Sequence, residues 1–418
     1  MAINDIIMYV MMTFLLIGAL DRIFEQFGGA ERVLGKVGLG AVGRSITGAG
    51  SEFEAGFTAM GSLALAMVGI IALAPVIAKV LGPVIVPVYH FLGANPAMFA
   101  GSILANDMGG FFLAREMAGG DTAAMLYSGL LLGAMMGPTI VFIIPVALGI
   151  IEKEDSRCMA LGILAGIVTI PLGTIAGGAA AMYSGVEVNG EIVPFTWSML
   201  LVNMIPVIIL AALICLGLKL MPQKMINGFQ IFAKLLVTLI TIGLAAAVVE
   251  RILGWTIIPG MDPIFMVAGD VPGGVMRAME TIGSIAIVLL GAYPMVLLLT
   301  RWFDKPLMRA GSALKMNEIA TGGMIATLAN VIPMFGMLKN MDNRGKVINC
   351  AFAVSAAFTF GDHLGFTAGV MAPMILPMIV GKLVGGVTAV AVAILLMPKD
   401  IAGSQAAPVP ADGKEALS

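Results

Sequence analysis

Charged residues are scarce in this sequence. Only 11% of its 418 residues are Asp, Glu, Lys or Arg, while 59% are hydrophobic, and the mean hydropathy is +1.02. So few polar side chains cannot cover the surface of a water-soluble globule. The composition therefore predicts an integral membrane protein.

Blocks of like charge and grouped cysteines are also missing. The formal net charge is −2, and no run of one sign occurs along the chain, which argues against nucleic acid as a partner. The three cysteines stand singly in or beside apolar runs and form neither a disulfide framework nor a metal-ligand spacing. We expect no catalytic residues, no metal and no resident cofactor. Whether H⁺ or Na⁺ acts as a coupling ion is left open.

Hydropathy divides the chain into nine stretches that approach or exceed the roughly 20 apolar residues needed to cross a bilayer. The first carries Asp5 where a signal peptide would carry a basic residue, so we interpret it as a retained span. The nine predicted spans are residues 5–24, 57–81, 122–150, 158–182, 196–218, 229–249, 281–299, 347–380 and 383–397.

Two further stretches, 83–117 and 306–337, are long enough to cross but are interrupted by Pro, Gly and Asn. Such interruptions are typical of re-entrant or broken helices that are buried inside protein. If both crossed fully, the chain would have eleven crossings. The predicted fold is therefore an all-α integral membrane protein with about 9–11 transmembrane helices.

These two stretches repeat one another. At an offset of 224 residues, "LANDMGGFFLAREM" aligns with "LANVIPMFGMLKNM", which matches Asn106 to Asn330 and places Gly137 on Gly361. Neighbouring blocks align at offsets of 222 and 225. An internal repeat of this kind predicts two related membrane units, with the first in residues 1–225, the second in 226–398, and a disordered cytoplasmic tail in 399–418.

Basic residues predict the orientation of the spans. With the N-terminus outside, seventeen of the 23 Lys and Arg residues, Arg157 and Lys346 among them, fall in cytoplasmic segments, as the positive-inside rule requires. The outer segments keep only Lys79, Arg115, Arg251, Arg277 and Lys382. The N-out, C-in arrangement makes the two repeats inverted, so that one broken segment opens outward and the other inward. Alternating-access transporters show this pattern.

Charged side chains at membrane depth are the candidate site, because an Asp there costs about 2.5–3.5 kcal/mol unless it faces a watery cavity or a partner. Asp107 and Asp362 are the candidate carboxylates, and His363 is the candidate coupling residue. Asn106 and Asn330 offer amides to a hydroxyl or an ion. Ring faces suited to an organic cation come from Phe111, Phe360 and Phe366.

Each candidate has a structural alternative. Asp107 could be a solvated residue at the end of its segment, and His363 could only hydrogen-bond the neighbouring Asp362. The asparagines could cap broken helices, and the phenylalanines could pack. Arg115 and Glu116 are expected at an interface, where long side chains reach toward headgroups.

The segments "MAINDIIMYVMMTFLLIGALDRIFEQFGG", "GSILANDMGGFFLAREMAGG" and "FGDHLGFTAGVMAPMI" resemble the bacterial ethanolamine permease family of ethanolamine utilisation operons. The resemblance covers the chain to about residue 400. It implies ethanolamine uptake across the bacterial inner membrane, with ethanolamine and the lipid bilayer as partners. It assigns no binding residues.

Other functions compete with this interpretation. A cation-coupled transporter of another small polar amine would need the same residue types, and a membrane scaffold or sensor for the ethanolamine pathway would need a cytoplasmic interaction surface. An intramembrane aspartyl protease is excluded because Thr359 in "TFGD" stands where its motif requires glycine. The 53 glycines permit close helix contacts, including those of a homo-oligomer.

Overall fold

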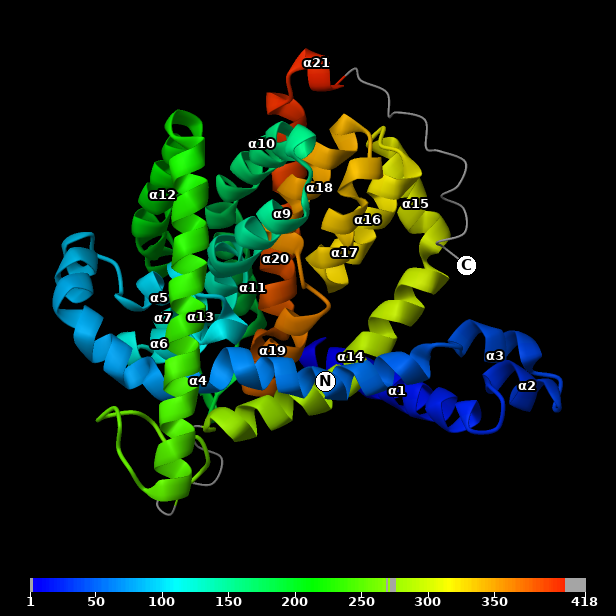
Figure 1. The fold of residues 1–418 in the computed structure, drawn as a ribbon, viewed down its shortest axis with the longest axis horizontal. Helices are drawn as coiled ribbons and strands as arrows, with labels where there is room; N and C mark the ends of the chain where they lie inside the picture. Colours follow the sequence, from blue (N-terminus) through cyan, green and yellow to red (C-terminus); the bar gives the residue numbers. More distant parts are fainter. Residues whose placement is uncertain (1–2, 268–269, 271–275, 403–418) are drawn as a thin grey trace.

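The computed structural model is a helical bundle that describes residues 3–267, 270 and 276–402 (Figure 1). Within those residues the strands are β1 (Glu187–Val188) and β2 (Glu191–Ile192), which pair antiparallel in a small hairpin. The all-α prediction is confirmed.

Long apolar helices dominate the fold. Among the described residues, seven helical segments are long and apolar enough to cross a membrane, and an eighth is added if the bent pair Thr122–Ala134 and Met136–Ile150 counts as one span. The helices that form the seven segments are α1 (Ile3–Glu25), α4 (Ala49–Phe91), α10 (Ser156–Ile167) with α11 (Ile170–Ser184), α12 (Trp197–Leu220), α13 (Pro222–Leu253), α14 (Ala278–Trp302), and α19 (Asp362–Met371) with α20 (Ile375–Leu396).

This count is below the nine to eleven crossings predicted from the sequence. The predicted span 347–380 is broken, because α18 (Asn343–Ala356) ends before a turn and α19 begins at Asp362. The predicted loop at Gly381 and Lys382 is wrong, since α20 is continuous through both residues. Gly381 is a close-packing position, where an added Cβ would meet the carbonyl oxygen of Gly173.

The predicted beginning of the first interrupted stretch, at residue 83, is also wrong. Helix α4 continues to Phe91 with Pro75, Pro83 and Pro87 inside it. Proline is tolerated within membrane helices because neighbouring helices and local backbone adjustments satisfy the freed carbonyl groups.

Both interrupted stretches contain a helix pair that breaks at the predicted asparagine. The first pair is α5 (Ala97–Ile103) and α6 (Gly110–Met117), joined through η1 (Asn106–Met108). The second pair is α16 (Glu318–Ala329) and α17 (Val331–Met337), with Asn330 between them in an extended conformation.

Each broken helix pair packs against another interruption of the helices. The first pair meets the bend near Gly137, and the second meets the turn at Gly361 between α18 and α19. An added Cβ at Gly137 would overlap the carbonyl oxygen of Leu104, and one at Gly361 would overlap that of Ala329. At the second crossing the backbones also bond directly, because Phe360 N donates to Leu328 O at 2.8 Å. Backbone contact of this kind fixes each break against its partner.

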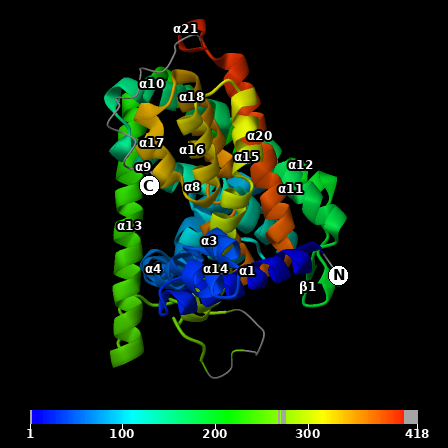
Figure 2. The same ribbon diagram turned by 90° about the vertical axis from the view of Figure 1, so that its right-hand side faces the viewer.

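The bundle has two groups of helices (Figures 1 and 2). Helices α1, α4 and α14 pack together at one end, and α10, α18 and α20 pack together toward the other, while α13 runs along one side. Helix α19 lies against α14 and α20. This arrangement places the beginning of α19 in the interior.

Shorter elements complete the chain. Residues 399–402, assigned to the disordered tail by the sequence, form a helical turn whose Asp400 pairs with Arg157 at 2.7 Å, while 403–418 lie outside the described residues. The remaining elements are α2 (Ala30–Gly35), α3 (Gly40–Ile46), α7 (Thr122–Leu126), η2 (Tyr127–Leu131), η3 (Leu132–Ala134), α8 (Met136–Pro138), η4 (Thr139–Ile143), α9 (Ile144–Ile150), η5 (Lys153–Asp155), α15 (Asp304–Ala313), η6 (Leu338–Asn340), η7 (Ala372–Met374) and α21 (Lys399–Ala402).

Candidate functional site

Two carboxylates from separate breaks lie near one another in the interior. Asp107 lies in η1, and Asp362 is the first residue of α19. The two elements that carry them, η1 and α19, are in direct contact. The hydroxyl of Tyr293, on α14, donates to Oδ1 of Asp362 at 2.7 Å. The fold thus brings together the two aspartates singled out in the sequence, although they are 255 positions apart, since 362 − 107 = 255.

A buried histidine and a buried lysine lie on the other side of Asp107. Nε2 of His363 is 3.9 Å from Oδ1 of Asp107, and Nδ1 of His363 is 2.9 Å from Nζ of Lys382. Lys382 also donates to the carbonyl oxygen of Ala134. His363 is therefore oriented toward Asp107, and the alternative that it only hydrogen-bonds Asp362 has no such contact among the described residues.

Aromatic rings lie beside the carboxylates. Phe111 and Phe366 are both buried and meet edge to face, with ring centroids 6.0 Å apart. Phe360 lies elsewhere, because it lines an apolar pocket with Leu328 and Leu364. The structure therefore brings together two of the three candidate phenylalanines.

The two candidate asparagines differ in their surroundings. Oδ1 of Asn330 accepts from the backbone N of Ile332 at 2.9 Å, so this side chain caps α17 as the structural alternative predicted. Asn106 is fully buried, and its Oδ1 and Nδ2 have no hydrogen-bond partner among the described residues. Such a group costs free energy unless something binds it, so Asn106 is the better candidate for contact with a solute.

Two open pockets approach these residues from opposite ends of α14 and α19. The Arg115 pocket has a volume of about 630 Å³, and the Tyr293 pocket has a volume of about 470 Å³. The Arg115 pocket is lined by residues that include Phe111, Arg115, Thr122, Thr281 and Val370. The Tyr293 pocket is lined by residues that include Glu52, Tyr293, Thr300, Asn330 and Gly361.

Asp362 and Phe366 lie along α19 between these two pockets. Helix α19 reaches the Tyr293 pocket next to Gly361 and the Arg115 pocket at Val370, with Asp362 and Phe366 between those points. A small cation that passed along α19 from one pocket to the other would therefore meet the carboxylate of Asp362.

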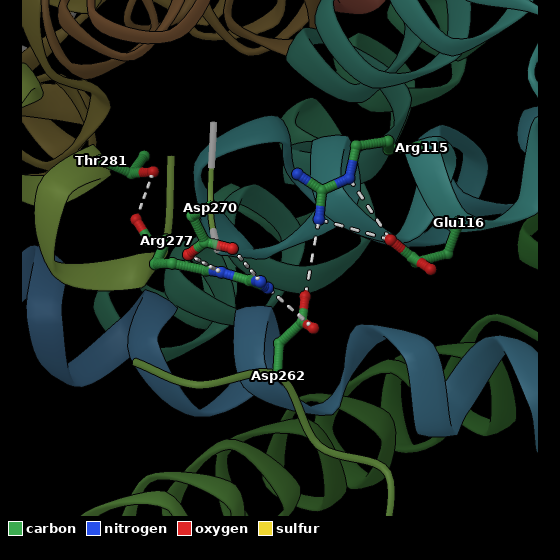
Figure 3. Close-up of polar contacts among 6 residues, drawn as sticks. All are labelled: Arg115, Glu116, Asp262, Asp270, Arg277 and Thr281. Atoms are coloured by element: carbon green, nitrogen blue, oxygen red, sulfur yellow. Dashed lines mark hydrogen bonds and ion pairs between the residues drawn. The ribbon is translucent and has the colours of Figure 1, made fainter. Parts of the chain in front are cut away.

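An ion-pair network borders the Arg115 pocket (Figure 3). Arg115 on α6 is 3.7 Å from Asp262, and Arg277 is 2.9 Å from the other oxygen of the same carboxylate. Arg277 also donates twice to Asp270, which holds the pKa of Asp270 below its usual value. These ion pairs of Arg115, Asp262, Asp270 and Arg277, here called the clasp, tie α6 to the segment before α14. The sequence alone predicted that Arg115 reaches toward headgroups.

We expect the clasp to limit access to the Arg115 pocket. Arg277→Gln removes contacts worth about 0.5–1 kcal/mol in total, as partly exposed ion pairs are, so opening should become roughly two- to fivefold more frequent. The measurement is the rate at which a polar maleimide labels a cysteine placed at Thr122, in a chain whose native cysteines are changed to alanine. Arg44→Gln, which breaks the exposed pair with Glu31, is the control. Equal labelling rates with and without the Arg277→Gln substitution would refute the clasp.

The lowered pKa of Asp270 also sets the pH range of the clasp. A carboxyl group with a depressed pKa stabilises the folded contact above its unfolded pKa, and this contribution is lost only as the pH falls through the lower, folded value. The Arg277–Asp270 contact therefore persists in mildly acidic medium.

Lys382 and Tyr293 are the site residues that the sequence alone did not reveal. Lys382 was counted among basic residues of outer segments, although it is 1% exposed inside α20. The sequence feature that could have revealed Lys382 is a single lysine within an apolar stretch that continues on both sides of it. Tyr293 has a weaker signal, because a tyrosine in an apolar helix is common. The described residues contain no group of His, Cys, Asp or Glu that could hold a metal ion.

Comparison with known proteins identifies relatives along almost the whole chain. The family model described as "Ethanolamine utilisation protein, EutH" matches residues 3–396. Proteins named "Probable ethanolamine permease EutH" from Salmonella typhimurium and from Escherichia coli are each 70% identical over 400 residues, covering 96% of this chain and 97% of the relative. A protein of the same name from Listeria monocytogenes is 53% identical over 396 residues, covering 95% of both chains. No solved structure matches the chain.

Proposed function

Because the chain belongs to the EutH family of ethanolamine utilisation proteins, we propose that it is an ethanolamine permease that carries protonated ethanolamine inward across the bacterial inner membrane by alternating access. The observation that carries the mechanism is the pair Asp107 and Asp362 on the contacting elements η1 and α19, with an open pocket at each end of α19.

The substrate chemistry fits these residues. Protonated ethanolamine has an ammonium group with three donors and a hydroxyl group that both donates and accepts. An ammonium group leaves water for a protein interior only where a negative charge compensates it. Asp362 and Asp107 provide that charge, the rings of Phe111 and Phe366 flank it, and the amide of Asn106 accepts from or donates to the hydroxyl.

Equivalent contacts in the two halves support inverted repeats. The offset of 224 residues pairs Leu104 with Leu328 and Gly137 with Gly361. Gly137 touches the carbonyl oxygen of Leu104, and Gly361 touches that of Ala329, one residue from the exact equivalent. In this proposal residues 1–225 and 226–398 are the two units, and each contributes one carboxylate to the site.

The predicted orientation, N-terminus outside and C-terminus inside, is supported by which charged segments meet. Segments assigned to the cytoplasm contact one another, because Lys346 pairs with Asp155 and Arg157 pairs with Asp400. Arg115 and Arg277, both assigned to outer segments, share the carboxylate of Asp262. In this orientation the Arg115 pocket faces outward and the Tyr293 pocket faces the cytoplasm.

Uptake by the purified protein tests the proposal. Proteoliposomes that contain only this protein should take up labelled ethanolamine saturably, and choline and serine should compete poorly, because three methyl groups or a carboxylate do not fit a site built around one bare ammonium group. With equal total ethanolamine and no pH gradient, entry that is no faster at the higher of two pH values, both below the pKa of the amine, supports the protonated form. A series with and without a sodium gradient tests coupling.

The same assay separates the rival functions. Flux equal to that of empty liposomes would refute the permease and would leave a scaffold or sensor role. Saturable transport of another small amine in preference to ethanolamine would refute the substrate while keeping the transport mechanism.

A further inference from the structure

Lys382 is a buried lysine whose side-chain nitrogen has no carboxylate directly beside it. Its side chain is 1% exposed, and its Nζ contacts the carbonyl oxygen of Ala134 and Nδ1 of His363. No carboxylate oxygen lies within 4.0 Å of this nitrogen among the described residues, although the charge of Asp107 acts on it. A lysine in such a place is costly to keep unless its charge has a function.

His363 connects the lysine to the site. A histidine nitrogen that accepts from an ammonium group leaves the other ring nitrogen protonated. In that tautomer Nε2–H of His363 faces Oδ1 of Asp107 across 3.9 Å. The His363–Lys382 pair therefore presents one positive charge to Asp107, wherever the shared proton lies.

The formal charge of the interior can be counted from these groups. With Asp107 and Asp362 ionised and one excess proton on the His363–Lys382 pair, the interior holds two negative charges and one positive charge. The remainder is one negative charge, which a single ammonium group neutralises. Two negative charges without the pair would match a dication, and a neutral interior would reject a cation.

We infer that Lys382 sets the substrate charge of the permease, because its fixed positive charge opposite Asp107 leaves room for one monovalent cation. This inference rests on the proposed function, since it takes Asp107 and Asp362 as the cation site. Lys382 acts through His363 and the net charge of the site, so it is a specificity-determining residue that need not touch the substrate.

The other charged and titratable groups around the site leave this count unchanged. Tyr293, on α14, donates a hydrogen bond to Asp362 and stays neutral. Glu52, on α4, lines the open Tyr293 pocket, where water reaches it. From α18, which packs against α20, Lys346 pairs with Asp155. From α11, which also packs against α20, the titratable side chain is the exposed Tyr183.

Charge compensation between two substitutions tests the inference. Asp107→Asn makes the site neutral, and uptake of labelled ethanolamine should fall by about tenfold or more. Adding Lys382→Met restores one net negative charge, so the double variant should recover to within a fewfold of the wild-type rate. If Lys382 had a purely structural role, the double variant would take up ethanolamine no faster than the Asp107→Asn single variant.

The Lys382→Met variant should also change how strongly other amines compete with labelled ethanolamine for uptake. Ethylenediamine replaces the hydroxyl of ethanolamine with a second amine and is a dication in buffer acidic enough to protonate both groups. Its potency as a competitor, relative to unlabelled ethanolamine, should rise by about tenfold in Lys382→Met. Lys79→Met, at an exposed lysine of α4, is the matched control and should leave the ratio unchanged.

A second variant separates charge from folding. Lys382→Gln keeps a donor for the carbonyl oxygen of Ala134 but removes the charge, so it should behave as Lys382→Met does in both measurements. The inference would be overturned if the potency of ethylenediamine relative to ethanolamine were unchanged in Lys382→Met and Lys382→Gln, and if neither substitution restored uptake in the Asp107→Asn background. Saturable uptake by the wild-type protein would still support the permease proposal in that case. Absence of saturable wild-type uptake would overturn the proposed function and this inference with it.

Discussion

Asp362→Asn is expected to reduce ethanolamine uptake about 100-fold or more in reconstituted vesicles while the protein still folds. The substitution keeps the volume of the side chain and an oxygen that can accept from Tyr293, whose hydroxyl donates to Asp362 at 2.7 Å. It removes the negative charge. A buried ammonium group that loses a charged partner loses about 3 kcal/mol or more, which corresponds to a factor of roughly 100.

Two further variants make this result specific. Tyr293→Phe removes one hydrogen bond and keeps both carboxylates, so its effect should be smaller, about tenfold, as for a hydrogen bond to a charged group at the lower end of about 1.5–3 kcal/mol. Glu54→Gln, at an exposed residue that pairs with Arg22, should leave uptake unchanged. Elution as a single species in detergent verifies folding. Full uptake by a folded Asp362→Asn protein would remove Asp362 from the site.

Gly361→Ala is expected to unfold or misfold the second crossing and to abolish uptake with it. A Cβ at this position would overlap the carbonyl oxygen of Ala329, which is backbone and cannot rotate away as a side chain would. Overpacking of a well-packed interior costs about 1–3 kcal/mol, and backbone contact places this substitution at the upper end. Gly137→Ala should behave in the same way, because its Cβ would overlap the carbonyl oxygen of Leu104.

Gly283→Ala and Gly149→Ala are the matched controls. Nothing lies within 4 Å of an added Cβ at either position, and both glycines are helical. Alanine is favoured over glycine in helices by about 1 kcal/mol. The controls should therefore melt at or above the wild-type temperature, while Gly361→Ala and Gly137→Ala should melt several degrees lower. Equal melting temperatures for all four variants would contradict the close crossings.

The sequence predicted the breaks better than it predicted the helices. Asn106, Asn330 and Gly361 each interrupt an apolar run, and polar or flexible residues at membrane depth are tolerated mainly where the backbone is broken and buried in protein. The helix boundaries were harder to predict because proline and glycine have two meanings in membranes. Pro83 continues α4, and Gly381 permits contact with α11 without ending α20.

The composition of the site was only partly predictable for the same reason. Asp107, Asp362 and His363 are conspicuous because each is polar in an apolar stretch. Lys382 falls between the predicted spans 347–380 and 383–397, so the sequence did not predict its contact with His363. The separation of Phe360 from Phe366 depends on the direction in which the chain leaves Gly361, and no pattern of residue types encodes that direction.

The contact between Phe111 and Phe366 also matters for the energy supply of the cell. Proton conduction through a protein needs an unbroken file of hydrogen-bonded water, and a dry apolar constriction interrupts such a file. The two rings are 6% and 0% exposed; Phe111 lines the Arg115 pocket, and Phe366 lies along α19 between the two pockets. In the proposed mechanism, a membrane that contains many copies of this protein therefore keeps its electrochemical potential while no substrate is carried.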